Sequence, residues 1–255
     1  MQDISMFFWP GRFLCMTPSL KTSMHQHHAI QITLSLANPF KIRFSKEAEF
    51  KEYKSLIIDS NCPHEFIGEG KYLFLYFDPE TEAGVLLKQK YLNERTINEL
   101  VIESSRVAKI FNCCITPTEE KIAYEMTHMI LPEWVSESKA NDKRISKIIE
   151  YLNQQLDRDI DIKSLASKVF ISESRLMHLF KSEIGIPIRK YILWNRLALA
   201  VKSVLEGRNL TEASYAAGFS DSSHFTRTFK DMFGITPSDI FKNSRYIQVI
   251  TSFKS

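Results

Sequence analysis

The segments SESRLMHLFKSEIGI at 172–186 and DSSHFTRTFKDMFGI at 221–235 repeat one pattern at an offset of 49 residues. Each copy begins with polar residues, continues with apolar residues at helical spacing and ends on Gly-Ile. A short stretch with small residues precedes each copy, Leu165-Ala166-Ser167 in the first and Ala213-Ser214-Tyr215 in the second. A short helix, a tight turn and a second helix make the helix-turn-helix arrangement. The repeat therefore predicts two such motifs, at about 162–185 and 210–234.

Helical spacing divides the second helix of each copy into a buried stripe and an outward face. The expected stripes are Leu176, Leu179, Phe180 and Ile184 in the first copy, and Phe225, Phe229, Met232 and Phe233 in the second. The outward faces carry hydrogen-bonding and cationic groups and no carboxylate, and a guanidinium can bond guanine O6 and N7 together. The residues predicted to read base edges are Ser174, Arg175, His178, Ser223, Thr226 and Arg227.

The stretch 187–207 reads as one helix that joins the two copies and spans roughly 30 Å. One turn of B-DNA is about 34 Å long, so the two outward faces fit successive major grooves on one side of a duplex. Basic side chains beside these faces would hold phosphates. The residues predicted for this role are Lys168, Lys181, Arg196, Arg208 and Lys230.

The distribution of charge agrees with an anionic partner. The chain has a net charge of only +3, but residues 141–255 hold 18 Lys and Arg against 12 Asp and Glu, a net charge of +6. Residues 1–140 carry a net charge of −3. Such asymmetry indicates nucleic acid as a partner, although a basic helical face taken alone is more often solvated surface.

Roughly the last 110 residues resemble the AraC/XylS family of bacterial transcription regulators. The resemblance rests on Arg196-Leu197-x-x-Ala200, on Ala217-Gly218-Phe219-Ser220-Asp221-x-x-His224-Phe225-x-Arg227-x-Phe229-Lys230, and on Phe233-Gly234-Ile235-Thr236-Pro237. The chain departs from the family pattern at Ile240-Phe241, where an aromatic residue followed by Arg is common. The resemblance implies double-stranded DNA and RNA polymerase as partners, activation as the commoner outcome, a small-molecule effector and a homodimer.

The N-terminal half has the period of β-strands. Apolar residues alternate with others at 29–36 and at 40–45, which is typical of half-buried strands, and the continuous apolar runs 56–58 and 72–77 suit strands buried on both faces. These strands predict a small β-sandwich or barrel, which is similar to the cupin-like effector domains of the resembled family.

Two helices are expected after these strands. The first would bury a stripe formed by Ile97, Leu100, Val101, Val107, Ala108 and Phe111. The second would open at the capping box Thr116-Pro117-Thr118-Glu119 and end at Leu131-Pro132. Its apolar stripe is assigned to a dimer contact, with intradomain packing as the alternative, and consists of Ile122, Met126, Met129 and Ile130.

The fold class predicted from these patterns is α+β. A cupin-like effector or dimerisation domain would occupy 1–136, a linker 137–142, a DNA-binding domain 143–245 and a tail 246–255. No apolar run reaches the ~20 residues that a membrane helix needs, and no secretory signal is visible. The four cysteines, at 15, 62, 113 and 114, suit free thiols in the cytoplasm.

A mostly apolar effector pocket is expected inside the β-domain, although aromatic stripes more often form plain core. Its predicted lining is Trp9, Phe13, Ile32, Leu34, Phe74 and Tyr76.

A histidine cluster offers a second interpretation of the β-domain. His25, His27, His28 and the later His64 resemble cupin metal ligands, but Gln31 stands where a Glu ligand would be. Gln is a poor ligand for transition metals, so we expect no metal, no cofactor and no catalytic residue. The alternatives to a regulator are a cupin-type metal enzyme fused to a DNA-binding module and an alkyl-accepting repair protein that uses one Cys.

Overall fold

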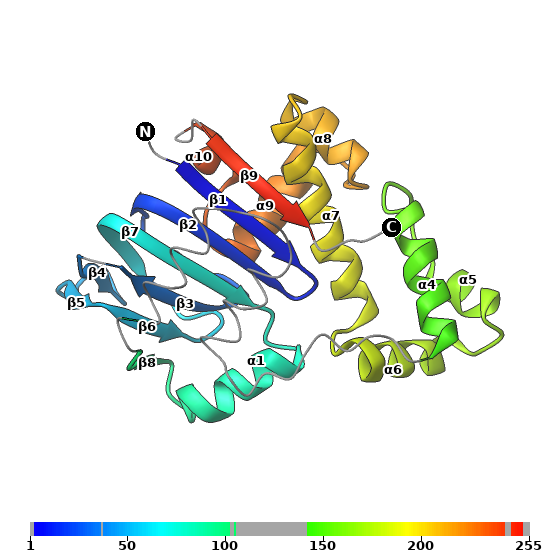
Figure 1. The fold of residues 1–255 in the computed structure, drawn as a ribbon, viewed down its shortest axis with the longest axis horizontal. Helices are drawn as coiled ribbons and strands as arrows, with labels where there is room; N and C mark the ends of the chain where they lie inside the picture. Colours follow the sequence, from blue (N-terminus) through cyan, green and yellow to red (C-terminus); the bar gives the residue numbers. More distant parts are fainter. Residues whose placement is uncertain (1–2, 37, 103–104, 106–141, 243–245, 252–255) are drawn as a thin grey trace.

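The computed structural model describes residues 3–36, 38–102, 105, 142–242 and 246–251 of the 255-residue chain. Figure 1 shows a twisted β-sheet built mainly by N-terminal residues, beside a group of helices built by residues 142–242. Among the described residues, no helix is both long and apolar enough to cross a membrane.

The strands form one sheet in the order β8-β6-β3-β7-β2-β1-β9, to which β4 and β5 are added beside β7. The bounds are β1 (Asp3–Trp9), β2 (Arg12–Lys21), β3 (Ile30–Ser35), β4 (Phe40–Arg43), β5 (Lys51–Tyr53), β6 (Ser55–Ile58), β7 (Glu65–Phe77), β8 (Ile97–Glu99) and β9 (Tyr246–Thr251).

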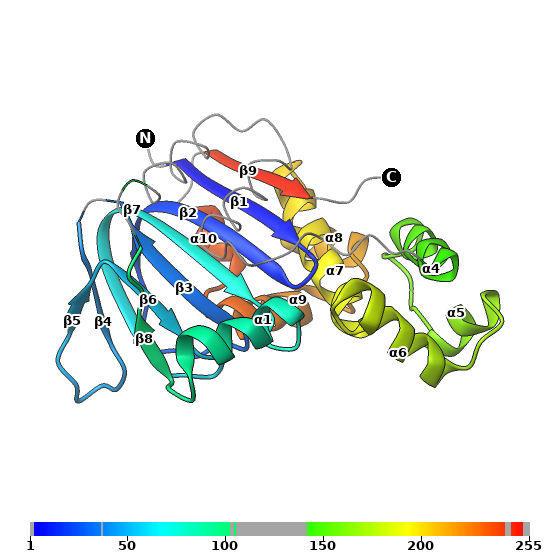
Figure 2. The same cartoon turned by 60° about the horizontal axis from the view of Figure 1, so that its bottom comes forward.

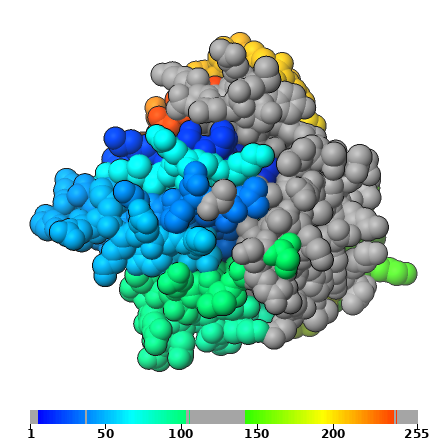
Figure 3. Space-filling model, turned by 60° about the vertical axis from the view of Figure 1, so that its left-hand side comes forward, coloured from blue at the N-terminus to red at the C-terminus, as the bar shows by residue number. Residues whose placement is uncertain are grey.

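The long strand β7 organises the sheet. One edge of β7 pairs with β2 over both of its halves, while its other edge is shared by β4 and β3. The register of β2 shifts between Thr17 and Ser19, and such an irregularity increases local bend and twist. The sequence predicts a small β-sandwich or barrel for this part. Its β-rich character is confirmed, and the strands form one sheet, whose β4–β5 hairpin stands out in Figure 3.

Both faces of the sheet are covered, which corrects the expectation of a half-buried strand for β3. Its aliphatic residues Ile30, Ile32 and Leu34 belong to one core cluster. The polar residues Gln31 and Thr33 point to the opposite face, yet both are buried, and Gln31 Nε2 donates to Thr33 Oγ1 at 2.9 Å. Successive side chains of β3 therefore point to opposite faces of the sheet, and both faces are buried. The face that carries Gln31 and Thr33 is buried because the C-terminal helices pack on it.

The sequence patterns do not predict the helix that covers the first face. Helix α1 (Glu82–Leu87) begins after Thr81, whose hydroxyl accepts from the Gly84 N–H at 3.0 Å, and it continues as the π-helix η1 (Lys88–Leu92). Leu87 and Leu92 are buried in the same cluster as β3. Burial against the sheet thus stabilises a segment that is short for a helix in isolation.

A strand stands where the first of the two helices was predicted to begin. Ile97–Glu99 form β8 and pair with β6, from Ile58↔Ile97 to Leu56↔Glu99. Val101, expected on the buried stripe, is fully exposed. Pairing with a strand forty residues away is invisible in local periodicity, which is why that prediction was wrong. Most of the predicted first helix and the whole of the second, with Ile122, Met126, Met129 and Ile130, lie outside the described residues.

The second part is helical, as predicted. Its helices are α4 (Lys143–Gln154), α5 (Ile162–Lys168), α6 (Glu173–Ile184), α7 (Ile188–Leu205), α8 (Leu210–Ala216), α9 (Ser222–Phe233) and α10 (Pro237–Lys242). The pairs α5–α6 and α8–α9 are helix-turn-helix units, and α7, with its 18 residues, spans about 27 Å between them. In Figures 1 and 2, α4 to α6 stand away from the sheet, whereas α9 lies against it.

The end of the chain returns to the sheet. The sequence predicts a tail for 246–255, but Tyr246–Thr251 form β9, which pairs in parallel with β1 from Asp3↔Tyr246 to Phe8↔Thr251. The expectation of a separate tail is corrected for these residues. The same sheet therefore contains strands from both ends of the chain (Figure 2).

Candidate nucleic-acid interface

The first helix-turn-helix is built by local signals. Ser172 caps α6 by accepting from the Arg175 N–H at 3.2 Å, and Leu176, Leu179 and Phe180 are buried, as predicted. The turn before it carries Phe170 at φ 56° with its side chain 95% exposed.

The turn of the second unit is one residue longer, with five residues between α8 and α9 against four between α5 and α6. Asn209 and Glu212 form a reciprocal capping box at α8, and Asp221 caps α9 through the His224 N–H at 2.7 Å. Gly218 has φ 77°, and a Cβ there would overlap the carbonyl oxygen of Leu156. Glycine is required at this position both for its backbone conformation and for the close approach of the 156 carbonyl.

The outward faces of α6 and α9 are open to solvent. Phe225, Phe229, Met232 and Phe233 are buried, so α9 presents its opposite side. Of the residues predicted to read bases, Thr226 is half-buried and the others are exposed: Ser174, Arg175, His178, Ser223 and Arg227.

The predicted phosphate contacts do not all share this exposure. Lys181 and Arg208 are exposed, and Lys168 is exposed with its Nζ 4.3 Å from the centre of the Tyr151 ring. Lys230 is exposed but lines a cavity between α9 and the sheet.

Arg196 is less exposed than the other residues predicted to contact phosphates. It is half-buried in α7, and its Nε and Nη2 donate to the carbonyls of Leu156 and Arg158 at 3.0 and 2.6 Å. Burial lowers the pKa of the Arg196 guanidinium, while nearby Asp159 and Asp157 oppose that shift. Arg196 therefore fixes the turn after α4 with two of its donors, and its contact with a phosphate stays a prediction.

Phe233 anchors the second helix-turn-helix to the sheet. Its ring centre lies 4.6 Å from that of Phe13 and 5.5 Å from those of Tyr76 and Trp194. These rings come from β2, β7 and α7, so the last turn of α9 sits where sheet and helices meet. One core cluster accordingly runs through both parts of the molecule.

A polar contact accompanies this aromatic one. Asp78, fully buried after β7, accepts from Trp194 Nε1 at 3.2 Å and lies 3.7 Å from Lys190 Nζ. Lys190 also contacts Glu80 at 3.5 Å, and the backbone N–H of His28 donates to the Asp231 carbonyl at 2.8 Å. Sequence reasoning missed these residues, because isolated charges on different elements carry no periodic signal.

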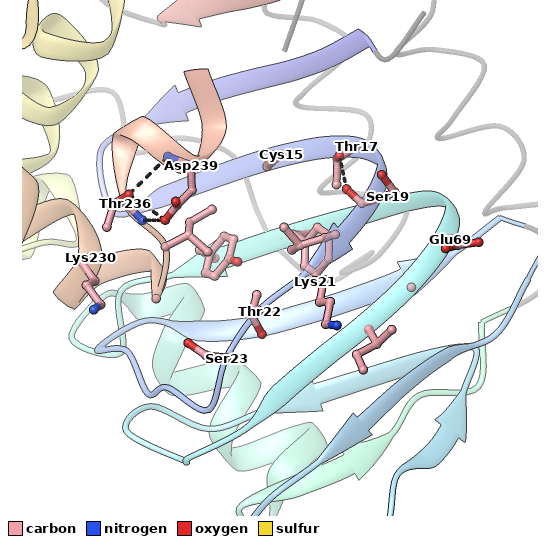
Figure 4. Close-up of a pocket in the computed structure, with 17 residues that line it drawn as sticks. Cys15, Thr17, Ser19, Lys21, Thr22, Ser23, Glu69, Lys230, Thr236 and Asp239 are labelled. Carbon is pink, nitrogen blue, oxygen red and sulfur yellow. Dashed lines mark hydrogen bonds between the residues drawn. The ribbon is translucent and has the colours of Figure 1, made fainter. Parts of the chain in front are cut away.

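A cavity of about 600 Å³ lies between the sheet and the end of α9 (Figure 4). Its lining mixes apolar residues such as Leu20 and Phe74 with polar ones, and Lys21 and Lys230 contribute two ammonium groups. Thr236 and Asp239, at the start of α10, close one side through their mutual hydrogen bonds.

The six residues predicted to line an effector pocket are not brought together. Phe74 and Tyr76 line the cavity, and Phe13 packs behind it on Tyr76 and Phe233. The other three belong to the core cluster on the opposite face of the sheet: Trp9, Ile32 and Leu34. Alternation along the strands separates the two groups.

The cysteines within the described residues have no activated thiol. Cys15 is buried, and burial raises its pKa to about 12. Burial also raises the pKa of Cys62, with a further contribution from Asp59. Both thiols are therefore protonated at neutral pH, which disfavours them as nucleophiles; Cys113 and Cys114 lie outside the described residues.

Comparison with known proteins supports the interpretation of the helical part. Residues 165–243 match the family model of a helix-turn-helix domain. The chain is 32% identical over 103 residues to the probable transcriptional regulator LumQ of Photobacterium leiognathi, which covers 40% of this chain and 42% of that protein. It is 34% identical over 101 residues to the arabinose operon regulatory protein of Escherichia coli K12, which covers 38% and 34%.

The fold of the chain, including its first half, is similar to that of a solved structure. The structure of ToxT from Vibrio cholerae superposes with a TM-score of 0.50 at 10% identity, over 91% of this chain and 98% of that one. At such identity the likeness concerns the fold alone. The chain spans less than half the length of both curated relatives.

The helical part is thus a helix-turn-helix domain in which the motif occurs twice. It is of the AraC type, and the resemblance stated from the sequence is confirmed. The relatives named above are regulators of transcription or of an operon and not enzymes, in agreement with the expectation of a non-enzymatic protein.

Proposed function

We propose that this chain is a sequence-specific DNA-binding transcription regulator. The observation that carries the proposal is the pair of exposed faces on α6 and α9, joined by the single helix α7. Both faces bear an arginine, Arg175 and Arg227. Contrary to the expectation from the sequence, α9 also carries a carboxylate on this side, because the exposed Asp231 lies four residues after Arg227. Two such helices about one duplex turn apart suit neighbouring major grooves.

The experiment is selection of bound duplexes from a random pool by the full chain. A regulator enriches a defined sequence, because bidentate arginine contacts discriminate between bases. Binding that enriches no sequence and depends only on salt would overturn the proposal, since phosphate contacts alone carry no sequence information.

We further propose that a small molecule occupies the cavity beside α9 and regulates DNA binding. Support comes from its position, since its lining includes residues of β2 and β7 together with Lys230 and Gly234 at the end of α9. The mixed lining suits a molecule with polar and apolar parts. A compound that binds there should raise the Tm of the full chain, and Leu20→Trp, which fills the cavity, should remove that shift; a shift that survives would place the compound elsewhere.

Activation, contact with RNA polymerase and dimerisation remain predictions. The stripe assigned to the dimer lies outside the described residues. The names of the two relatives described above indicate regulation and give no direction for it. A promoter carrying the selected site in front of a reporter separates activation from repression.

A further inference from the structure

Three histidines converge where α9 packs on the sheet. The ligand nitrogens of His25, His27 and His64 lie within 4.8 Å of one another, and their ring centres are 4.4–5.8 Å apart. His27 and His64 are buried, with 2% and 1% of their surface exposed, and His25 is half-buried.

The backbone holds these residues in place. His25 and His64 exchange two backbone hydrogen bonds, of 3.0 and 2.8 Å, and the Asn61 N–H donates to the His27 carbonyl at 2.7 Å. Because these backbone hydrogen bonds already hold the three histidine residues in place, they lose little conformational entropy when they bind a ligand.

Hydrogen bonds also define the tautomer of two of the three rings. The Nδ1 atoms of His25, His27 and His64 lie 2.7, 2.8 and 2.9 Å from backbone carbonyl oxygens. A carbonyl oxygen only accepts, so in His25 and His64 Nδ1 carries the proton and Nε2 keeps its lone pair. In His27 both nitrogens face an oxygen, because Gln31 Oε1 lies 2.9 Å from its Nε2. Histidines that bind metal ions have this same arrangement of an outer N–H bonded to a carbonyl.

We propose that His25, His27 and His64 bind one divalent metal ion of the zinc class through their Nε2 atoms. Imidazole nitrogens suit zinc and its neighbours in the first transition row. Three histidines bind zinc with one coordination position left open. The inference concerns the sheet and does not depend on the proposed DNA binding.

Gln31 explains why the sequence argued against such a site. Its Oε1 lies 2.9 Å from His27 Nε2 and accepts a hydrogen bond from that nitrogen when the nitrogen carries a proton. A metal ion has to displace this proton and the hydrogen bond to Gln31. A glutamate at the same position would instead add a negative charge and a ligand oxygen, which predicts tighter binding for Gln31→Glu.

A second group of possible ligands serves as a contrast. His28, Asp78 and Glu80 also lie close together, but the Lys190 ammonium stands among them, 3.0 Å from His28 Nε2 and 3.7 Å from Asp78. The positive charge of Lys190 therefore already lies where a metal ion would have to bind. The three-histidine group contains no such ammonium, although Lys230 and Glu65 act on His25 with opposite charges.

The site touches the second helix-turn-helix. Gly234, the residue that ends α9, has φ 77°, and a Cβ on it would overlap the His25 ring. The Nε2 and Cδ2 edge of His25 and the Cδ2 of His27 are the atoms that face Gly234. An ion bound by these rings therefore lies at the contact between the sheet and α9.

The test uses the full chain, stripped with a chelator and dialysed against Zn²⁺ or Co²⁺. We expect one equivalent of bound metal by elemental analysis, a visible Co²⁺ spectrum typical of nitrogen ligands in a site of low coordination number, and a higher Tm with Zn²⁺. His64→Ala and His27→Ala should weaken binding at least ~100-fold, beyond the 10–100-fold cost of losing an outer-shell partner. His178→Ala and His224→Ala, which alter exposed histidines, are the matched controls and should bind like the wild type.

Several results would overturn the inference. These are a wild-type chain that retains no metal at micromolar free Zn²⁺, or equal losses in the control variants. If an alanine variant does not fold, as circular dichroism would show, Gln31→Glu decides: it should bind metal at least ten-fold more tightly. An affinity unchanged by Gln31→Glu would place the metal elsewhere.

Discussion

Arg227 lies exposed on α9, on the side opposite the buried Phe225 and Phe229. A guanidinium there can bond the O6 and N7 atoms of one guanine. We expect Arg227→Ala to relax preference at one or two base positions by about 1–3 kcal/mol and to leave the others unchanged. Binding to a panel of single-base variants of the selected site measures this, with Arg208→Ala as the control. A uniform loss at all positions would assign Arg227 to the phosphates.

Lys181 lies exposed in the last turn of α6. An ammonium at this place neutralises a phosphate and releases a counterion. Lys181→Ala should therefore weaken binding to every duplex alike and reduce the slope of log K against log salt by about 1. Titrations at several salt concentrations measure that slope. A loss confined to particular bases would contradict the assignment.

Asp78 ties the two parts of the molecule together electrostatically. Burial disfavours its carboxylate, but contacts from His28 and the Glu80 backbone N–H favour it. The charge of Lys190 and the hydrogen bond from Trp194 act in the same direction, so the pKa of Asp78 lies below its usual value. A depressed pKa contributes stability above the unfolded value near 3.8, and this contribution is lost as the pH falls through that range.

Urea unfolding of the wild type and Asp78→Asn between pH 6 and pH 3 tests this contribution. The wild type should have the higher free energy of unfolding near pH 6, and the difference should shrink as the pH drops below 4. Glu80→Gln, which alters an exposed partner of Lys190, is the control and should change little. A difference that stays constant with pH would remove the electrostatic explanation.

At the scale of elements, α9 packs on the sheet as well as on the other helices of the helical part. Phe233 is fully buried among rings from the sheet and from α7. Phe233→Ala should cost about 3–5 kcal/mol of unfolding free energy, because it leaves a cavity at this junction. Phe170→Ala removes a ring that is 95% exposed and should cost less than about 0.5 kcal/mol. Equal costs, measured by urea unfolding, would show that the junction is not a stabilising contact.

The elements differ in how well the sequence predicts them. The helices α6 and α9 follow from local signals, namely the caps Ser172 and Asp221 and the closing glycines Gly185 and Gly234. The strand β8 depends on pairing with β6, and α1 depends on burial against the sheet, so neither has a local signal. Long-range contacts decide such segments.

The same limit applies to single side chains. Periodicity placed Arg175 and Arg227 on open faces, because a helix repeats every 3.6 residues. It could not show that Arg196 binds two carbonyls across the chain, or that His25 and His64 meet through a backbone bridge. These contacts join segments about forty residues apart.

At the scale of the whole molecule, the sheet and the two helix-turn-helix units form one connected structure. The second unit is packed on the sheet through α9, and β9 brings the end of the chain beside β1. The first unit is held at the other end of α7 (Figure 1). A ligand or ion bound at the α9 contact therefore acts on one unit more directly than on the other.

The spacing of base preferences in the selected duplexes tests the account most directly. The helix α7 fixes the distance between α6 and α9, the two helices proposed to read bases. The duplexes selected by the full chain should therefore show two patches, that is, two short runs of preferred bases, about ten base pairs apart. Arg175→Ala should lose preference in one patch and Arg227→Ala in the other. A single patch, a variable spacing, or loss of both patches in either variant would contradict the account.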